Sequence, residues 1–145
     1  MNEKEKDLLI KDLCARLPYG VKCAYFDIKG EIKVGELFTV WCNEKRVFID
    51  KLSIDYDGGD CIGVIPYLFP LSSMTKEQLF EVQEILGKNE IEIEDGFLHI
   101  VDSDRNVITY LEILALLEWF YKNHFDIYGL IPMELAIDAT GLDIY

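Results

Sequence analysis

The stretch VKCAYFDIKGEIKVGELFTVWC, residues 21–42, decides the fold. It holds two runs rich in β-branched and aromatic residues, 21–28 and 31–42, on either side of Lys29-Gly30. Such residues favour strands, and a short glycine-containing connection between two strand-like runs favours a tight turn. The stretch therefore predicts an antiparallel hairpin. Gly35 interrupts the alternation of the second run and predicts a β-bulge.

Further strand-like runs follow toward the C-terminus. Residues 47–49 and 52–56 predict a third strand, and residues 61–68 predict a fourth. The short connections between consecutive runs favour an antiparallel meander. Pro66 and Pro70 lack the backbone N–H that a ladder needs, so we expect the end of the fourth strand at an edge or outside the sheet.

Three helices are predicted. One precedes the meander in the sequence, over residues 3–17, and two follow it, over residues 76–86 and 110–124. Each begins with a capping-box pattern, in which a short polar residue precedes a glutamate or glutamine by three positions. The three pairs are Asn2 with Glu5, Thr75 with Gln78, and Thr109 with Glu112.

The third helix and the residues after it carry much of the apolar content. The helix over residues 110–124 is apolar around most of its circumference, which is typical of a buried central helix. We therefore expect this helix to form the spine of the core. Residues 125–145 are apolar but broken by glycine and proline, and we expect an ordered tail wrapped over the core.

A second hairpin is predicted over residues 90–101. Isoleucine and glutamate alternate at first, and Asp95-Gly96 is a preferred dipeptide for a two-residue turn between residues 90–94 and 97–101. The acidic side chains would line the solvent-facing side of the first strand. They are the candidate partner-binding residues: Glu90, Glu92, Glu94 and Asp95.

The overall prediction is a single α+β domain of 145 residues, an antiparallel β-meander packed against two or three helices. Half of the residues are hydrophobic, which is enough to form a core. The N-terminus has no apolar signal-peptide core, and the four cysteines show no close pairing. Reduced thiols and a cytoplasmic location are therefore expected. No run of 18 apolar residues predicts a membrane span.

Charge is distributed unevenly along the chain. The net charge is −13, and residues 52–145 contain only Lys76, Lys88, Arg105 and Lys122 as basic side chains. An acidic surface repels nucleic-acid backbones and anionic membranes and favours a basic protein partner. The alternative is that the negative charge only keeps the protein soluble.

Two acidic segments carry carboxylates of the kind that bind hard metal ions. Asp55, Asp57 and Asp60 flank two glycines and could gather oxygens around a hard cation, but Asp and Gly also supply ordinary turn geometry. The segment that starts at Asp102 begins like a calcium loop, yet it lacks the glycine at the sixth position and the glutamate at the twelfth. We retain only the first triplet as a candidate metal site.

A ligand site is the other chemical hypothesis. His124, Asp126 and Tyr128 follow the third helix among aromatic residues, and His124 could act as a general base at the rim of a pocket. Alternatively, a cationic His124 complements the helix dipole. No cysteine–histidine metal spacing, phosphate loop or nucleophile motif is present, so no catalytic residue and no cofactor are assigned.

Three stretches, taken in order, carry a resemblance. They are LCARLPYGVK (13–22), PYLFPLSSMTKEQ (66–78) and NHFDIYGLIPMELA (123–136). Together they resemble a group of small proteins from gut Bacteroides-type bacteria and their phages or mobile elements, which have no assigned activity. The matching stretches cover 37 of the 145 residues. The resemblance implies a cytosolic protein in a bacterial or phage setting and transfers no catalytic residue.

The leading hypothesis is a non-catalytic protein-binding accessory factor of a mobile element or phage. The hypothesis depends on the acidic surface and on the lack of a catalytic motif. A small ligand-binding protein or enzyme with an aromatic-lined pocket near His124 and Asp126 is the alternative from another class. A structural or self-assembling component is a third, and a homo-oligomer is compatible with the sequence.

Overall fold

The computed structural model describes the chain except residues 28, 42–45, 51–62, 88–89, 95–96 and 102–108. The α-helices are α1 (Glu3–Arg16), α2 (Lys76–Ile85) and α3 (Tyr110–Lys122), and two short 3-10 helices are η1 (Leu17–Tyr19) and η3 (Leu71–Ser73). The strands are β1 (Lys22–Phe26), β2 (Ile32–Trp41), β3 (Arg46–Ile49), β4 (Val64–Leu68), β5 (Glu90–Glu94), β6 (Phe97–Val101) and β7 (Ile137–Asp138).

The main sheet has the strand order β3-β2-β1-β4-β7. The hairpin of β1 and β2 and the antiparallel pairing of β2 with β3 confirm the predicted order of the first three strands as far as residue 49. Residues 52–56, which the sequence predicts as part of the third strand, lie outside the described residues. The fourth strand departs from a strictly consecutive order, because β4 pairs antiparallel with β1 on the far side from β3. The last strand, β7, pairs parallel to β4.

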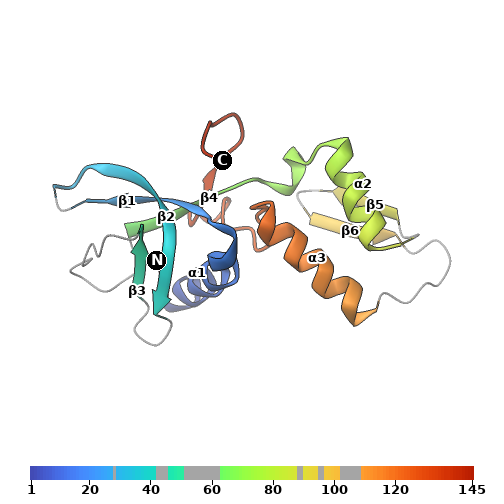
Figure 1. The fold of residues 1–145 in the computed structure, drawn as a ribbon, viewed down its shortest axis with the longest axis horizontal. Coiled ribbons are helices and arrows are strands. Elements are labelled where there is room, and N and C mark those ends of the chain that lie inside the picture. Colours follow the sequence, from blue (N-terminus) through green and yellow to red (C-terminus); the bar gives the residue numbers. More distant parts are fainter. Residues whose placement is uncertain (28, 42–45, 51–62, 88–89, 95–96, 102–108) are drawn as a thin grey trace.

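The elements gather at two ends of an elongated molecule (Figure 1). We call α1, η1, β1–β4 and β7 the sheet lobe, and α2, β5, β6 and α3 the helical lobe. The predicted second hairpin is present, since β5 and β6 pair antiparallel in a sheet of their own. The fold is α+β, as the sequence predicts.

One core cluster lies between α1 and one face of the main sheet. Leu13 of α1, Cys23 of β1 and Leu68 of β4 are fully buried in it, and Leu130 and Leu135 from the C-terminal segment complete it. The predicted tail therefore packs over the core of its own chain. It is also held by Tyr145, whose hydroxyl donates to the carbonyl oxygen of Tyr67 over 2.7 Å.

A second core cluster lies between α2 and α3. Val82 and Leu86 of α2 meet Phe120 of α3 and Phe125, which follows α3. The ring of Phe125 stacks on Trp119, with the ring centroids 5.6 Å apart. Aromatic rings bury large areas, so this cluster contributes a large part of the packing between α2 and α3.

The three predicted capping boxes are confirmed. In each, the cap side chain accepts a hydrogen bond from the third helical backbone N–H, and the glutamate or glutamine accepts one from the cap N–H. These bonds satisfy N–H groups that have no partner inside the helix. The start of every long helix was therefore readable from local sequence.

The prediction that α3 forms the spine of the core is wrong for its first half. Only Leu116 and Phe120 of α3 are buried, while its N-terminal half projects from the lobe. Tyr110 and Leu111 are 73% and 75% exposed. An apolar circumference predicts burial only when other elements cover every side, and α2 covers one side of α3.

Two local expectations in the sheet are also corrected. Gly35 pairs in regular register with Cys23, and the register shift lies between Leu37 and Thr39. Glycine is required at position 35 because an added Cβ would clash with the Ile49 side chain. Pro66 lies inside the sheet opposite Cys23, with β7 beginning to pair one residue later.

Candidate functional site

A buried ion pair joins the two lobes. Arg16 and Asp12 are one turn apart on α1, and both are fully buried. Arg16 donates to the Asp12 carboxylate from Nε over 2.6 Å and from Nη2 over 2.9 Å. Nη2 also donates to the carbonyl oxygen of Phe125 over 2.7 Å. The guanidinium therefore ties α1 to the chain segment that follows α3.

Further polar groups surround this pair. The guanidinium lies over the ring of Tyr121, 5.2 Å from its centroid, and the Tyr121 hydroxyl is 3.2 Å from that of Tyr128. Burial raises the pKa of Asp12, and the hydrogen bonds from Arg16 oppose that shift. Burial also raises the pKa of the Cys23 thiol, which removes the thiolate that nucleophilic chemistry would need.

His124 lies at this junction and is neutral rather than cationic. Burial and the nearby Arg16 lower its pKa from 6.5 to about 4. The expectation of a cationic histidine that complements the helix dipole is therefore wrong. The ring stacks on Tyr145, with the centroids 4.0 Å apart, and the backbone takes a left-handed φ of 59°. The side chain thus helps to fix the turn that leads out of α3.

Asp126 and Tyr128 are also engaged by the fold. The two carboxylate oxygens of Asp126 accept hydrogen bonds from the backbone N–H groups of Leu130 and Ile131, each over 2.8 Å. These two hydrogen bonds stabilise the turn after α3. Tyr128 contacts the Tyr121 hydroxyl and lies under the ammonium of Lys11, which is 5.4 Å from its ring centroid. Each of the three predicted ligand residues therefore has a structural partner of its own.

A small hollow lies elsewhere, between β2 and β3. Its volume is about 210 Å³, and it is lined by Glu36, Leu37, Phe38 and Asp50. Pockets for small organic ligands usually enclose roughly 300–1,000 Å³. Asp50 is already committed there, because its Oδ1 accepts the backbone N–H of Glu36 over 2.8 Å. The hollow therefore has the character of a surface depression beside the bulge.

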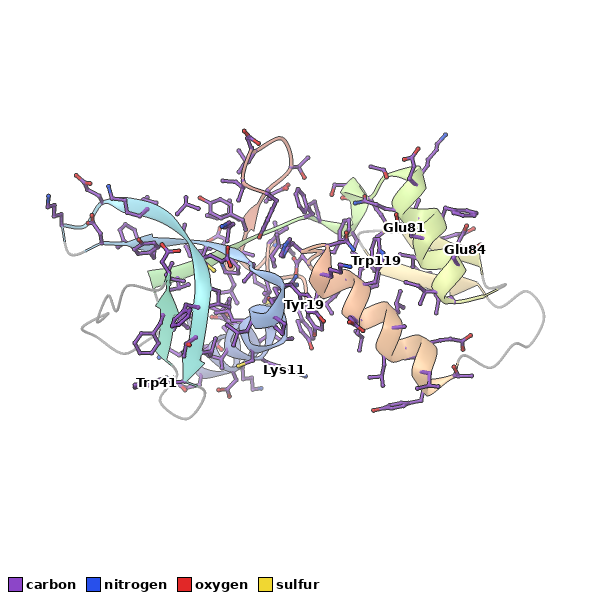
Figure 2. The ribbon with its side chains drawn as sticks, in the orientation of Figure 1. Lys11, Tyr19, Trp41, Glu81, Glu84 and Trp119 are labelled. Atoms are coloured by element: carbon purple, nitrogen blue, oxygen red, sulfur yellow. The ribbon has the colours of Figure 1, made fainter. Side chains whose placement is uncertain are left out.

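The clearest surface feature lies on α2. Its solvent side carries Glu77, Glu81 and Glu84 around Phe80, which is 62% exposed. Figure 2 shows Glu81 and Glu84 on α2 above Trp119 of α3. Glu81 accepts a hydrogen bond from the Trp119 indole over 2.9 Å. We call the four α2 residues the α2 acidic face.

Three of the four predicted partner-binding residues lie on β5, which packs beside α2. Glu92 and Glu94 are exposed on β5, whereas Ile93 between them packs into the core of the helical lobe. Glu90 is in β5 as predicted, and Asp95 lies outside the described residues. The helical lobe therefore carries exposed carboxylates on α2 and on β5.

Comparison with known proteins was made at the levels of sequence and structure. No family model, curated protein or solved structure matches the chain. The site is therefore interpreted from its own residues.

The candidate metal triplet, Asp55, Asp57 and Asp60, lies outside the described residues. Within the described part of the chain, no group of three or more His, Cys, Asp or Glu side chains is placed to hold a metal ion. The segment from Asp102 to Asn106 is also outside that part.

Sequence reasoning missed two features. The buried pair of Asp12 and Arg16 has the i, i+4 spacing of an ordinary surface ion pair, and the apolar neighbours of both residues on α1 were the available signal. For the α2 acidic face, the available signal was the spacing of Phe80 from the glutamates three positions before it and four positions after it. This helical spacing places all three side chains on one face.

His124 makes stability depend on pH. Its folded pKa of about 4 is below the ordinary 6.5, so between these values the unfolded chain binds a proton that the folded chain does not. Stability supplied by neutral His124 is therefore complete above pH 6.5 and is lost as the pH falls toward 4. Urea unfolding at pH 7 and pH 4.5 should show a smaller loss for His124→Asn than for the original chain. Asparagine tolerates the left-handed backbone at this position.

The matched control is His99→Asn, since His99 is exposed on β6. We expect this variant to lose as much stability between the two pH values as the original chain does. An identical loss in all three proteins would contradict the assignment of a neutral, buried His124.

Proposed function

We propose that the protein is a non-catalytic protein-binding accessory factor of a bacterial mobile element or phage, and that it engages a basic protein partner. The α2 acidic face carries the proposal. The setting in a mobile element or phage is supported by the sequence resemblance alone.

The α2 acidic face suits a lysine- or arginine-rich partner. Phe80 offers an exposed ring on which a cationic side chain can lie, and such cation–π contacts contribute about 0.5–1 kcal/mol at exposed sites. Glu77 and Glu84 flank the ring by one helical turn on either side. They would pair with the same cation or with its neighbours. An aromatic anchor with a charged rim is a common design of protein interfaces.

The rest of the helical lobe strengthens the attraction. Glu92 and Glu94 add exposed carboxylates on the hairpin, and Glu118 adds one on α3. Within the described parts of α2, β5, β6 and α3, the basic residues are Lys76 and Lys122. A field of one sign raises the association rate of an oppositely charged partner and falls with salt.

A binding role also agrees with the state of the titratable groups at the junction. Asp12, Arg16 and Cys23 are fully buried, and Asp126 is occupied by two backbone N–H groups. Groups that act in general acid–base catalysis must reach a bound substrate. The geometry of these residues favours a structural role.

The test is capture from a gut-bacterial lysate by the tagged protein at low and high salt, followed by mass spectrometry. We expect a defined basic protein to be held at low salt and released at high salt. Glu77→Lys/Glu84→Lys should reduce its capture at least tenfold, because attractive charges become repulsive ones. Glu81 is left unchanged, since it bonds to Trp119.

The matched control is Glu134→Lys/Asp143→Lys, at two exposed positions of the C-terminal segment, which changes the net charge by the same amount. It should capture the partner nearly as well as the original chain. Equal losses in both double variants would mean that net charge alone is recognised. Capture of nothing at either salt would overturn the proposal.

A further inference from the structure

Two buried nitrogen atoms at the junction of the lobes lack a hydrogen-bond partner among the described residues. They are Nη1 of Arg16 and Nδ1 of His124. Arg16 is fully buried, and His124 is 9% exposed. Buried polar atoms in folded proteins are nearly always hydrogen-bonded, either to protein groups or to ordered water. Each of these atoms therefore calls for a partner that the described side chains and backbone do not supply.

The bonds that Arg16 already makes define the direction of its free donor. Nε donates to the Asp12 carboxylate, and Nη2 donates to that carboxylate and to the carbonyl oxygen of Phe125. A guanidinium is planar, and all of its N–H groups lie in its plane. The N–H groups of Nη1 are therefore left on the edge away from Asp12. The Tyr121 ring covers one face of the group, with its centroid 5.2 Å from the guanidinium carbon.

His124 lies beside this guanidinium. The carbonyl oxygen that Nη2 contacts belongs to Phe125, the next residue in the chain. Burial and the positive charge of Arg16 lower the pKa of His124 to about 4, so its ring is neutral at pH 7. A neutral imidazole has one N–H group and one bare nitrogen, which accepts a hydrogen bond. The ring is held in place by stacking on Tyr145, with the centroids 4.0 Å apart.

From these two unpartnered atoms, we infer that a buried water molecule binds at the lobe junction, where it accepts a hydrogen bond from Arg16 Nη1 and donates one to His124 Nδ1. Water is the smallest ligand that accepts and donates at the same time. Globular proteins contain about one buried water per 27 residues, and such waters typically bond to buried polar groups that have no other partner.

The charges around the site favour a neutral ligand over an ion. A cation would be repelled by Arg16. An anion would lie near the Asp12 carboxylate and the Phe125 carbonyl oxygen, and a bare His124 Nδ1 offers it no donor. Burial and the negative charge of Asp126 raise the pKa of Asp12, so a second carboxylate already acts on this region.

The water would form a second link between the lobes. Arg16 lies on α1 of the sheet lobe, and His124 lies in the turn after α3 of the helical lobe. The direct bond from Arg16 Nη2 to Phe125 is the first link. Water-mediated hydrogen bonds are enthalpically nearly as favourable as direct ones. The bound water would therefore help to fix the angle at which the turn leaves α3.

A high-resolution crystal structure of the original chain is the first test. We expect a water oxygen within about 2.7–3.2 Å of both Arg16 Nη1 and His124 Nδ1. A direct bond between the two atoms, a different partner for either atom, or the lack of a shared water would overturn the inference.

The tautomer of His124 gives an independent test in solution. Nitrogen-15 NMR of the histidine rings at pH 7 should show the proton of His124 on Nε2 and a hydrogen-bonded, bare Nδ1. His99, which is exposed on β6, provides the reference for a solvated ring. A proton on Nδ1 of His124 would contradict the inferred direction of the hydrogen bond and overturn the inference.

Oxygen-17 relaxation dispersion, which counts long-lived buried waters, tests the role of Arg16. Asp12→Leu/Arg16→Met should lose a single long-lived water relative to the original chain. The matched control is Glu31→Leu/Lys33→Met, which removes an ion pair whose side chains are 59% and 47% exposed. It should keep the original count. An unchanged count in a folded Asp12→Leu/Arg16→Met chain, or the same loss in both variants, would overturn the inference.

Discussion

Replacing Arg16 with methionine should lower the free energy of unfolding by about 3–5 kcal/mol. The substitution leaves the fully buried Asp12 carboxylate without its cation and the Phe125 carbonyl without its donor. A buried charge without a partner carries most of its desolvation cost into the folded state. Urea unfolding monitored by circular dichroism measures the loss.

The double variant Asp12→Leu/Arg16→Met is the decisive comparison. It removes both charges and leaves side chains of similar volume, so much of the stability lost in the single variant should return. A double variant as unstable as Arg16→Met would mean that the contacts of Arg16 with Phe125 and Tyr121, rather than the stranded carboxylate, account for the loss.

Replacing Phe125 with alanine should cost about 3–5 kcal/mol of unfolding free energy. The side chain is 1% exposed and packs against Phe69, which follows β4, and against Trp119 and Phe120 near the C-terminal end of α3. Its removal opens a cavity that these rings cannot fill by small movements. Differential scanning calorimetry should show a marked drop in Tm.

Phe80→Ala is the matched control, because it deletes the same side chain at a position 62% exposed on α2. We expect a change of less than about 0.5 kcal/mol, as is usual for surface substitutions. Similar losses at the two positions would contradict the assignment of Phe125 to the centre of the helical core.

Local signals were readable from the sequence, and long-range placement was not. The caps at Asn2, Thr75 and Thr109 depend on residues within one helical turn, so they fixed the starts of the helices. The pairing of β4 with β1 and of β7 with β4 joins segments far apart in the chain. No local pattern selects such neighbours.

The same distinction explains the errors at the candidate site. An apolar helix was expected to be buried, yet burial of α3 depends on how many elements reach it, and Leu114 remains exposed. His124 was assigned a positive charge from its place at the helix end. Its neutral state follows from burial and from Arg16, which is 108 residues earlier in the chain.

The chain leaves the sheet lobe and returns to it at one point. Phe69 and Phe125 form an isolated parallel bridge, in which Phe69 N–H donates to His124 and Asp126 N–H donates to Phe69. The segment between these two residues therefore begins and ends at neighbouring points of the fold. Tolerance to insertion depends on the burial and hydrogen bonding of the backbone concerned, and here Phe125 is 1% exposed while its carbonyl oxygen accepts from Arg16. The point where the helical lobe joins the sheet lobe is therefore a buried, hydrogen-bonded junction rather than a loop that tolerates insertion.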